Sequence, residues 1–179
     1  MIEKYFIGIV PPKEVLIRIE QFQRRWVSEL KVEPHITLKA QGGLTPDKFW
    51  ISKVKEVCGN FKSFQVSLGE PSFFGDNILY LSINDSRLLH DLHHKIVQTI
   101  APSGNLIKQY FEMEAYVPHL TIGKAMQGGL TPTSLKMMEE KAKKDLTPYP
   151  SFVVDFLRVY KLDVDKDGYE KLLDIPLHK

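Results

Sequence analysis

Two segments of this 179-residue chain are nearly the same. Residues 34–46 read PHITLKAQGGLTP and residues 118–132 read PHLTIGKAMQGGLTP. Once single insertions at Gly123 and Met126 are allowed, the two differ only by Ile/Leu exchanges. The copies lie close to half the chain apart. A repeat of this length predicts a duplicated fold, in which both copies build the same elements.

The likeness continues on both sides of the copies. Downstream, each Thr-Pro is followed by a helical stretch, 47–58 or 134–145, and then by Ser-Phe-Gln-Val or Ser-Phe-Val-Val. Upstream, an apolar stretch at 4–10 or 78–84 precedes the start of a helix. We therefore expect two units of strand, helix, histidine strand, helix and strand.

Apolar spacing supports this order. Residues at intervals of three and four predict amphipathic helices from Pro11-Pro12 to Leu30 and from about Ser86. Strands are expected at 5–10, 36–39, 64–68, 78–83, 120–122, 152–162 and 169–175. These elements predict an α+β fold of two pseudo-symmetric lobes, each a mostly antiparallel sheet with helices packed outside and an active cleft between them. Because no Gly-, Ser- or charge-rich linker divides the halves, we expect residues 1–179 to form a single two-lobed domain.

Composition narrows the class of protein. The formal net charge is only +2, which argues against coating long double-stranded nucleic acid but leaves room for a local basic pocket. The single cysteine, Cys58, has no partner within the chain, so we expect a buried, inert thiol and a reducing cytoplasm. No apolar run reaches the ~18–20 residues of a membrane span, so no membrane association is expected.

The His-x-Thr sequence within each copy contains the candidate catalytic residues. Side chains alternate across a strand, so His35 and Thr37 share one face while the apolar residues between them point to the other. His119 and Thr121 do the same. If a pseudo-two-fold axis relates the copies, two imidazoles and two hydroxyls meet in one cleft.

Such a cleft suits displacement at phosphorus. The ordinary pKa of histidine is ~6.5, so one imidazole can accept a proton from water while the other donates one to the leaving oxygen. Threonine hydroxyls can donate to the non-bridging oxygens, where negative charge develops. The scheme requires neither a metal nor another cofactor.

These motifs resemble those of the two-histidine (2H) phosphoesterase superfamily, also called LigT-like or 2′-5′ RNA ligase-like. His35-Ile36-Thr37-Leu38 and His119-Leu120-Thr121-Ile122 both fit its H-x-T/S-x pattern with an apolar last position. The resemblance implies a metal-independent phosphoesterase acting on cyclic phosphates or 2′-5′ phosphodiester bonds of nucleotides or RNA ends. It also implies that His35 is the proton donor, that His119 is the proton acceptor, and that Thr37 and Thr121 hold the phosphate.

Lysines and glycines follow both motifs. Lys39 and Lys124 are candidate substrate-binding residues, although lysines at strand ends are commonly just solvated. The glycine pairs after Gln41 and Gln127 can present N–H groups to a phosphate, but more often they only permit a turn. Thr45-Pro46 and Thr131-Pro132 have the pattern of helix N-caps with Pro in the first turn.

No metal site is expected elsewhere. The segment 163–168 opens like a calcium-binding loop, but its later positions fail the pattern, and Asp-Gly between two strands indicates a hairpin. His90, His93 and His94 fall on one helix. His90 and His94 are four residues apart and could hold a metal together, but no third ligand is suitably placed, which favours a solvated face. His178 is treated as incidental.

Two alternatives remain open. The chain could be a non-catalytic module that binds RNA ends or phosphate, or a reversible 2′-5′ RNA ligase in which a ribose hydroxyl is the nucleophile. The expected partner is a small nucleotide or an RNA terminus. The sequence does not fix an oligomeric state.

Overall fold

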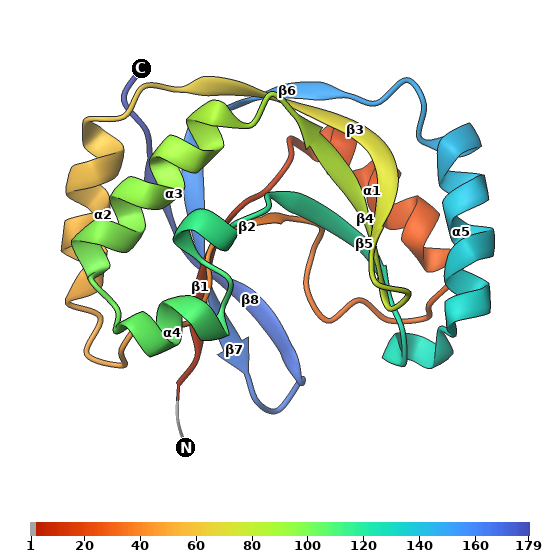
Figure 1. Ribbon diagram of the computed structural model, residues 1–179, viewed down its shortest axis with the longest axis horizontal. Helices are drawn as coiled ribbons and strands as arrows, with labels where there is room; N and C mark the ends of the chain where they lie inside the picture. Colours follow the sequence, from red (N-terminus) through yellow and green to blue (C-terminus); the bar gives the residue numbers. More distant parts are fainter. Residues whose placement is uncertain (1–2) are drawn as a thin grey trace.

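The computed structural model describes residues 3–179 (Figure 1). Within them, one antiparallel sheet has the strand order β6-β3-β4-β5-β2-β1-β7-β8. The strands are β1 (Tyr5–Ile9), β2 (Ile36–Lys39), β3 (Phe64–Phe74), β4 (Ile78–Asn84), β5 (His119–Lys124), β6 (Ser151–Val154), β7 (Phe156–Asp163) and β8 (Gly168–Pro176). The α-helices are α1 (Lys13–Arg24), α2 (Trp50–Gly59), α3 (Arg87–Ile100), α4 (Gly104–Gln109) and α5 (Pro132–Asp145).

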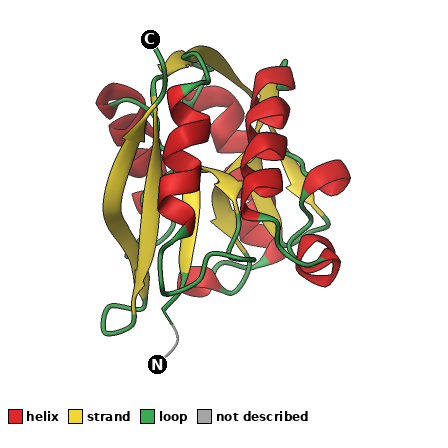
Figure 2. Cartoon of the chain, turned by 90° about the vertical axis from the view of Figure 1, so that its left-hand side faces the viewer, coloured by secondary structure: helices red, strands yellow, loops and turns green. Residues whose placement is uncertain are grey.

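The two motif strands, β2 and β5, lie side by side in the middle of the sheet. Beyond β2 come β1, β7 and β8, and beyond β5 come β4, β3 and β6. Helices α2 and α3 lie over the first group, on the left in Figure 1, and α1 and α5 over the second, on the right. Figure 2 shows the helices packed against the sheet. The predicted α+β fold of two antiparallel lobes is confirmed.

The two halves of the sequence are interlocked across these lobes. Helix α1 follows β1 but packs on β5, and α3 follows β4 but packs on β2. Strand β3 likewise leaves the first half to pair with β4. Each lobe is therefore assembled from both halves of the chain.

The two Ser-Phe segments of the repeat pair with each other at the far edge of the sheet. Phe64 lies across from Val154, and Val66 across from Phe152, so the two Ser-Phe segments run antiparallel to each other. The single strand expected at 152–162 is in fact two, because the chain leaves β3 at Asp155 and joins β1 as β7. Strand β3 is correspondingly longer than expected and reaches Phe74.

Two helix boundaries differ from expectation. Helix α1 ends at Arg24, and the following segment packs along β8 instead, where the N–H of Tyr169 donates to the carbonyl of Lys31. Thr131 caps α5 as predicted, accepting from the N–H of Ser134. Thr45 caps no helix: its hydroxyl donates to Asp47, and a left-handed backbone at Lys48 (φ 61°) delays the start of α2 to Trp50.

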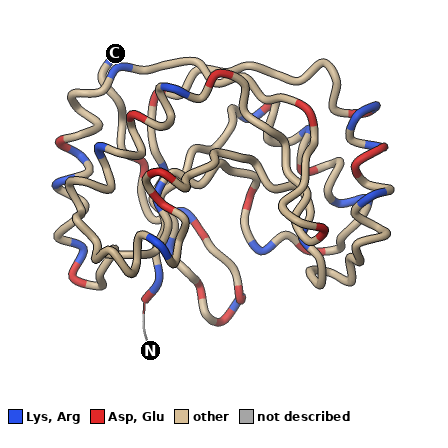
Figure 3. Tube along the Cα trace, in the orientation of Figure 1, with Lys and Arg blue, Asp and Glu red and all other residues tan. Residues whose placement is uncertain are grey.

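The burial of Cys58 and the hairpin at 163–168 agree with expectation. Cys58 is fully buried, and burial raises the pKa of its thiol to about 12. The segment 163–168 closes the β7–β8 hairpin. Positive and negative residues are interspersed along α5 (Figure 3). In the part of the chain that the structure describes, no helix has the length and apolar character needed to cross a membrane.

Candidate active site

Each motif buries its apolar residues and leaves its polar ones accessible. The apolar members are at most 2% exposed: Ile36, Leu38, Leu120 and Ile122. The histidines and threonines between them are half-buried. The alternation predicted from the sequence is confirmed.

Strand register brings the two motifs together. Ile36 lies across from Leu120 in the antiparallel pair of β2 and β5. This antiparallel alignment sets His35 and Thr121 on one side of the pair, and Thr37 and His119 on the other. The two histidines are diagonal neighbours, for which residues are typically ~7–8 Å apart and Cβ atoms somewhat closer. The register therefore places both imidazoles and both hydroxyls on the same face of the sheet, around the Ile36–Leu120 pair.

The two imidazoles are held in the same tautomer by the same kind of contact. His35 Nδ1 lies 2.8 Å from the carbonyl oxygen of Glu33, and His119 Nδ1 lies 2.7 Å from that of Val117. A carbonyl can only accept, so each Nδ1 carries the proton and donates it. Each Nε2 is left to exchange a proton with a ligand.

The loop that holds His35 is itself fixed. The carboxylate of Glu33 accepts from Arg158 at 2.6 Å and from the hydroxyl of Tyr160 at 2.9 Å. Arg158 also binds Asp174, so its charge is matched by two carboxylates. This network orients the carbonyl that receives the His35 proton.

Each histidine also rests in a pair of stacked aromatic rings, which the sequence analysis missed. Phe6 and Tyr160 are stacked 4.5 Å apart and lie 4.8 and 5.6 Å from the His35 ring. Phe74 and Tyr80 are stacked 4.2 Å apart and lie 4.8 and 5.2 Å from the His119 ring.

These rings come from matching places in the sheet. Phe6 and Tyr160 lie on β1 and β7, outside β2, and Tyr80 and Phe74 lie on β4 and β3, outside β5. The sequence does show an aromatic residue in each strand that flanks a motif strand. These residues can be assigned to the histidines only once the order of the strands is known.

Burial lowers the pKa of both histidines below the ordinary value for imidazole. The charge of His119 lowers the pKa of His35 further, whereas the Glu33 and Val117 carbonyls act in the opposite direction.

Lys39 is placed in the interior and not at the site. Its side chain is fully buried, and Nζ donates to the carbonyls of Ala40 and Gly42 and to Glu112 Oε1, at 2.8, 2.6 and 2.8 Å. A β-bulge explains the placement: Leu38 is an extra residue between the pairs Thr37–Gly8 and Lys39–Ile7, and bulges re-aim side chains. All three N–H donors are used within the chain.

Lys124 lies near the first histidine. It lines a cavity of about 250 Å³ together with His35 and Thr121. Leu30, Val32 and Gln127 form part of the same wall. Lys124 is exposed and is the last residue of β5. The cavity can accept part of a ligand whose anionic group contacts the motifs.

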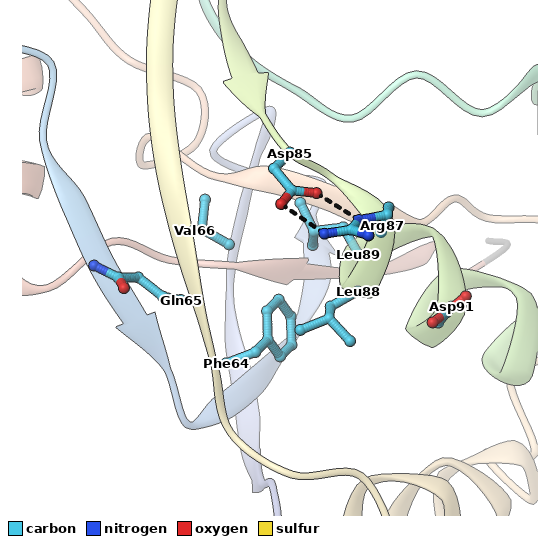
Figure 4. A pocket seen from close by; sticks show the side chains of 8 residues that line it. All are labelled: Phe64, Gln65, Val66, Asp85, Arg87, Leu88, Leu89 and Asp91. Atoms are coloured by element: carbon cyan, nitrogen blue, oxygen red, sulfur yellow. Dashed lines mark hydrogen bonds and ion pairs between the residues drawn. The ribbon is translucent and has the colours of Figure 1, made fainter.

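A second cavity, of about 370 Å³, contains no motif residue (Figure 4). It lies between β3 and the start of α3, with Phe64, Val66 and Leu89 among its walls. Its charged residues include Arg87 and Asp85, which bind each other. It offers no group for phosphate chemistry beyond that surface pair.

The helical histidines do not form a metal site. The expectation of a solvated face is wrong for His93, which is buried, because Nδ1 donates to the carbonyl of Leu38 and Nε2 accepts from the N–H of Met113. Among residues 3–179, no group of three or more His, Cys, Asp or Glu side chains could hold a metal ion. His178 has a structural contact, since its carbonyl accepts from the N–H of Ser63.

Comparison with known families decides the chain's membership. The family model described as the 2′-5′ RNA ligase superfamily matches residues 11–166. The chain belongs to the 2′-5′ RNA ligase superfamily. This superfamily of 2H phosphoesterases includes phosphoesterases and ligases, as the sequence resemblance implied.

Solved structures have the same fold as this superfamily member. E. coli LigT in apo form is 16% identical, with a TM-score of 0.63, over 100% of this chain and 99% of that one. E. coli LigT complexed with 3′-AMP is also 16% identical, with a TM-score of 0.63, over 100% of both chains. A protein described as a phosphoesterase is 14% identical, with a TM-score of 0.64 and full coverage of both chains. A comparison with curated protein sequences finds no significant match.

Proposed function

We propose that this protein is a metal-independent phosphoesterase that uses His35 and His119 as general acid and base. The proposed substrates are 2′,3′-cyclic phosphates or 2′-5′ phosphodiester bonds of small nucleotides or RNA ends. The observation that carries the proposal is the pair of imidazoles, each donating Nδ1–H to a carbonyl and each leaving Nε2 free at one site. Family membership and the 3′-AMP complex of LigT support the nucleotide class.

In the proposed reaction, His119 Nε2 takes a proton from water as the water oxygen attacks phosphorus. The bond from phosphorus to a ribose oxygen breaks on the opposite side, and His35 Nε2–H gives its proton to that oxygen. The product is a phosphomonoester with a free ribose hydroxyl. The assignment of donor and acceptor follows the family resemblance.

Three further groups complete the proposed site. Thr37 and Thr121 donate to the non-bridging phosphate oxygens, where charge accumulates in the transition state. Lys124 attracts the anion from the edge of the cavity. Lys39 is left out, because its donors are bound to Glu112 and to two carbonyls.

We expect a bell-shaped pH profile whose maximum in kcat/KM lies below pH ~6.5. The base must be neutral, which requires a pH above its pKa, and the acid must be protonated, which requires a pH below its pKa. Because both pKa values are lowered in the free protein, both limbs move to lower pH. A bound phosphate favours the charged imidazole, so the kcat maximum should lie at higher pH. A kcat/KM maximum above pH 7 would contradict this assignment.

The test of function is incubation of the purified protein with 2′,3′-cyclic nucleotides and 2′-5′ dinucleotides in the presence of EDTA. Release of a phosphomonoester that survives the chelator is the expected result. Binding without product would favour the phosphate-binding module. Joining of RNA halves that carry a cyclic phosphate and a free hydroxyl would identify the reversible ligase.

The remaining parts of the proposal concern the whole chain. We propose that residues 1–179 act as one two-lobed domain and that the protein works in the cytoplasm. No cofactor is assigned a role.

A further inference from the structure

Side chains hold the backbone of the first motif where a neighbouring strand would otherwise pair with it. Strands β2 and β5 share only the pair Ile36–Leu120. Beyond it, the carbonyl of Thr37 accepts from the hydroxyl of Tyr116 at 2.8 Å, and the carbonyl of Leu38 accepts from His93 Nδ1 at 2.6 Å. Buried carbonyls require such partners, so these two side chains replace the missing strand.

Tyr116 and His93 form one rigid unit. Their rings are stacked with centroids 3.8 Å apart and planes 10° apart. His93 is fixed at its other nitrogen by the N–H of Met113, 2.9 Å away. Burial raises the pKa of Tyr116 and lowers that of His93 to about 4, so both stay neutral near neutral pH with these hydrogen bonds intact.

The same short segment also holds the second motif. Tyr116 is followed by Val117, whose carbonyl receives the Nδ1 proton of His119. The Tyr116–Val117 dipeptide therefore touches the backbone of Thr37 and the ring of His119, the two residues on the same side of the Ile36–Leu120 pair.

We propose that Tyr116, supported by His93, is a positioning residue that fixes Thr37 and His119 relative to each other. The proposal rests on the proposed function, in which Thr37 holds the phosphate that His119 serves. It assigns Tyr116 no contact with substrate. The phenol acts through the backbone of one motif and the imidazole of the other.

The corresponding contacts of the second histidine motif provide a comparison for those of Tyr116 and His93. There, the carbonyl of Ile122, which matches Leu38, accepts from Gln23 Nε2 of α1 at 3.2 Å. Glutamine thus makes in one half the bond that His93 makes in the other. The residue matching Tyr116 is Val32, which has no hydroxyl to donate. Within residues 3–179, the phenolic tether is particular to the Thr37–His119 side.

Tyr116→Phe tests the tether, because it removes the hydroxyl and keeps the ring that stacks on His93. We expect kcat/KM for a 2′,3′-cyclic nucleotide to fall about tenfold, as for loss of one hydrogen bond that aligns reacting groups. We also expect ¹⁵N NMR of the imidazoles to show that His119 no longer holds a single Nδ1–H tautomer. Tyr149→Phe, which removes a hydroxyl outside the site, should leave both readouts at wild-type values.

A second pair of variants separates positioning from mere packing. His93→Gln should retain kcat/KM within a few fold, since Gln23 already makes the matching bond, whereas His93→Leu should lose about as much as Tyr116→Phe. Wild-type kcat/KM together with an unchanged His119 tautomer in Tyr116→Phe would overturn the proposal. So would equal activity of His93→Gln and His93→Leu.

The role of Tyr116 can still be tested if the protein proves not to be a phosphoesterase. Should the wild-type protein turn over no cyclic phosphate, the phosphoesterase proposal is lost, and affinity for inorganic phosphate replaces turnover as the readout. Weaker phosphate binding and a mixed His119 tautomer in Tyr116→Phe would still support the tether. Unchanged values of both would refute it.

Discussion

His35→Ala and His119→Ala should each lower kcat by about 10²–10⁴-fold on a 2′,3′-cyclic phosphate while the protein stays folded. Each variant removes one of the two Nε2 atoms that exchange protons at the site. The neighbouring rings, Phe6 with Tyr160 and Phe74 with Tyr80, stack on each other and so retain a partner. Initial rates with each variant, next to circular dichroism and thermal unfolding, check both parts of the expectation.

The matched control is His178→Ala. Its side chain is exposed and its structural contacts are made by backbone atoms, so neither rate nor stability should change. The pH profiles add a second readout: the variant that loses the base should lose the acid limb of the bell, and the one that loses the acid should lose the alkaline limb. Near wild-type turnover by either motif variant would rule out paired acid–base catalysis.

Lys39→Met should destabilise the protein by about 3–5 kcal/mol, the usual cost of removing one partner from a buried ion pair. The carboxylate of Glu112 is then left in the interior with the Ala40 N–H as its remaining partner, and two carbonyls lose their donor. Burial already raises the pKa of Glu112 and lowers that of Lys39, each opposed by the other. Denaturant unfolding measures the difference.

Two further variants show whether a loss of stability in Lys39→Met comes from its buried ion pair. Lys143→Met, in an exposed pair with Glu139 and Glu140, should cost less than about 1 kcal/mol. The double variant Lys39→Met with Glu112→Leu should recover much of the loss, because it leaves no unpaired charge. If Lys39→Met instead kept its stability and lost substrate affinity, the lysine would belong to the binding site after all.

The sequence allowed the motif faces to be predicted because alternation along a strand depends only on local geometry. His35 and Thr37 share a face for this reason, as do His119 and Thr121. The repeat supplied the rest, since two copies of one unit predict a shared cleft at their symmetry axis. Both predictions required no knowledge of which strands are neighbours.

Features that depend on long-range pairing were not accessible in the same way. The bulge at Leu38 turns Lys39 inward, yet it is visible only once β2 is paired with β1. The aromatic pairs require the order of four strands, and the Tyr116 contact with Thr37 requires that β5 lie beside β2. Burial of His93 has the same origin, because its partners are the carbonyl of Leu38 and the N–H of Met113.

The crossing of α1, α3 and β3 between lobes bears on how such a chain could arise. A half-length polypeptide that ends after β3 would contain β2 without α3, the helix that packs on it, and α1 without β5, the strand on which it packs. A second copy could supply the missing elements by exchanging the same ones in return, which would bring one motif histidine from each copy to the same sheet.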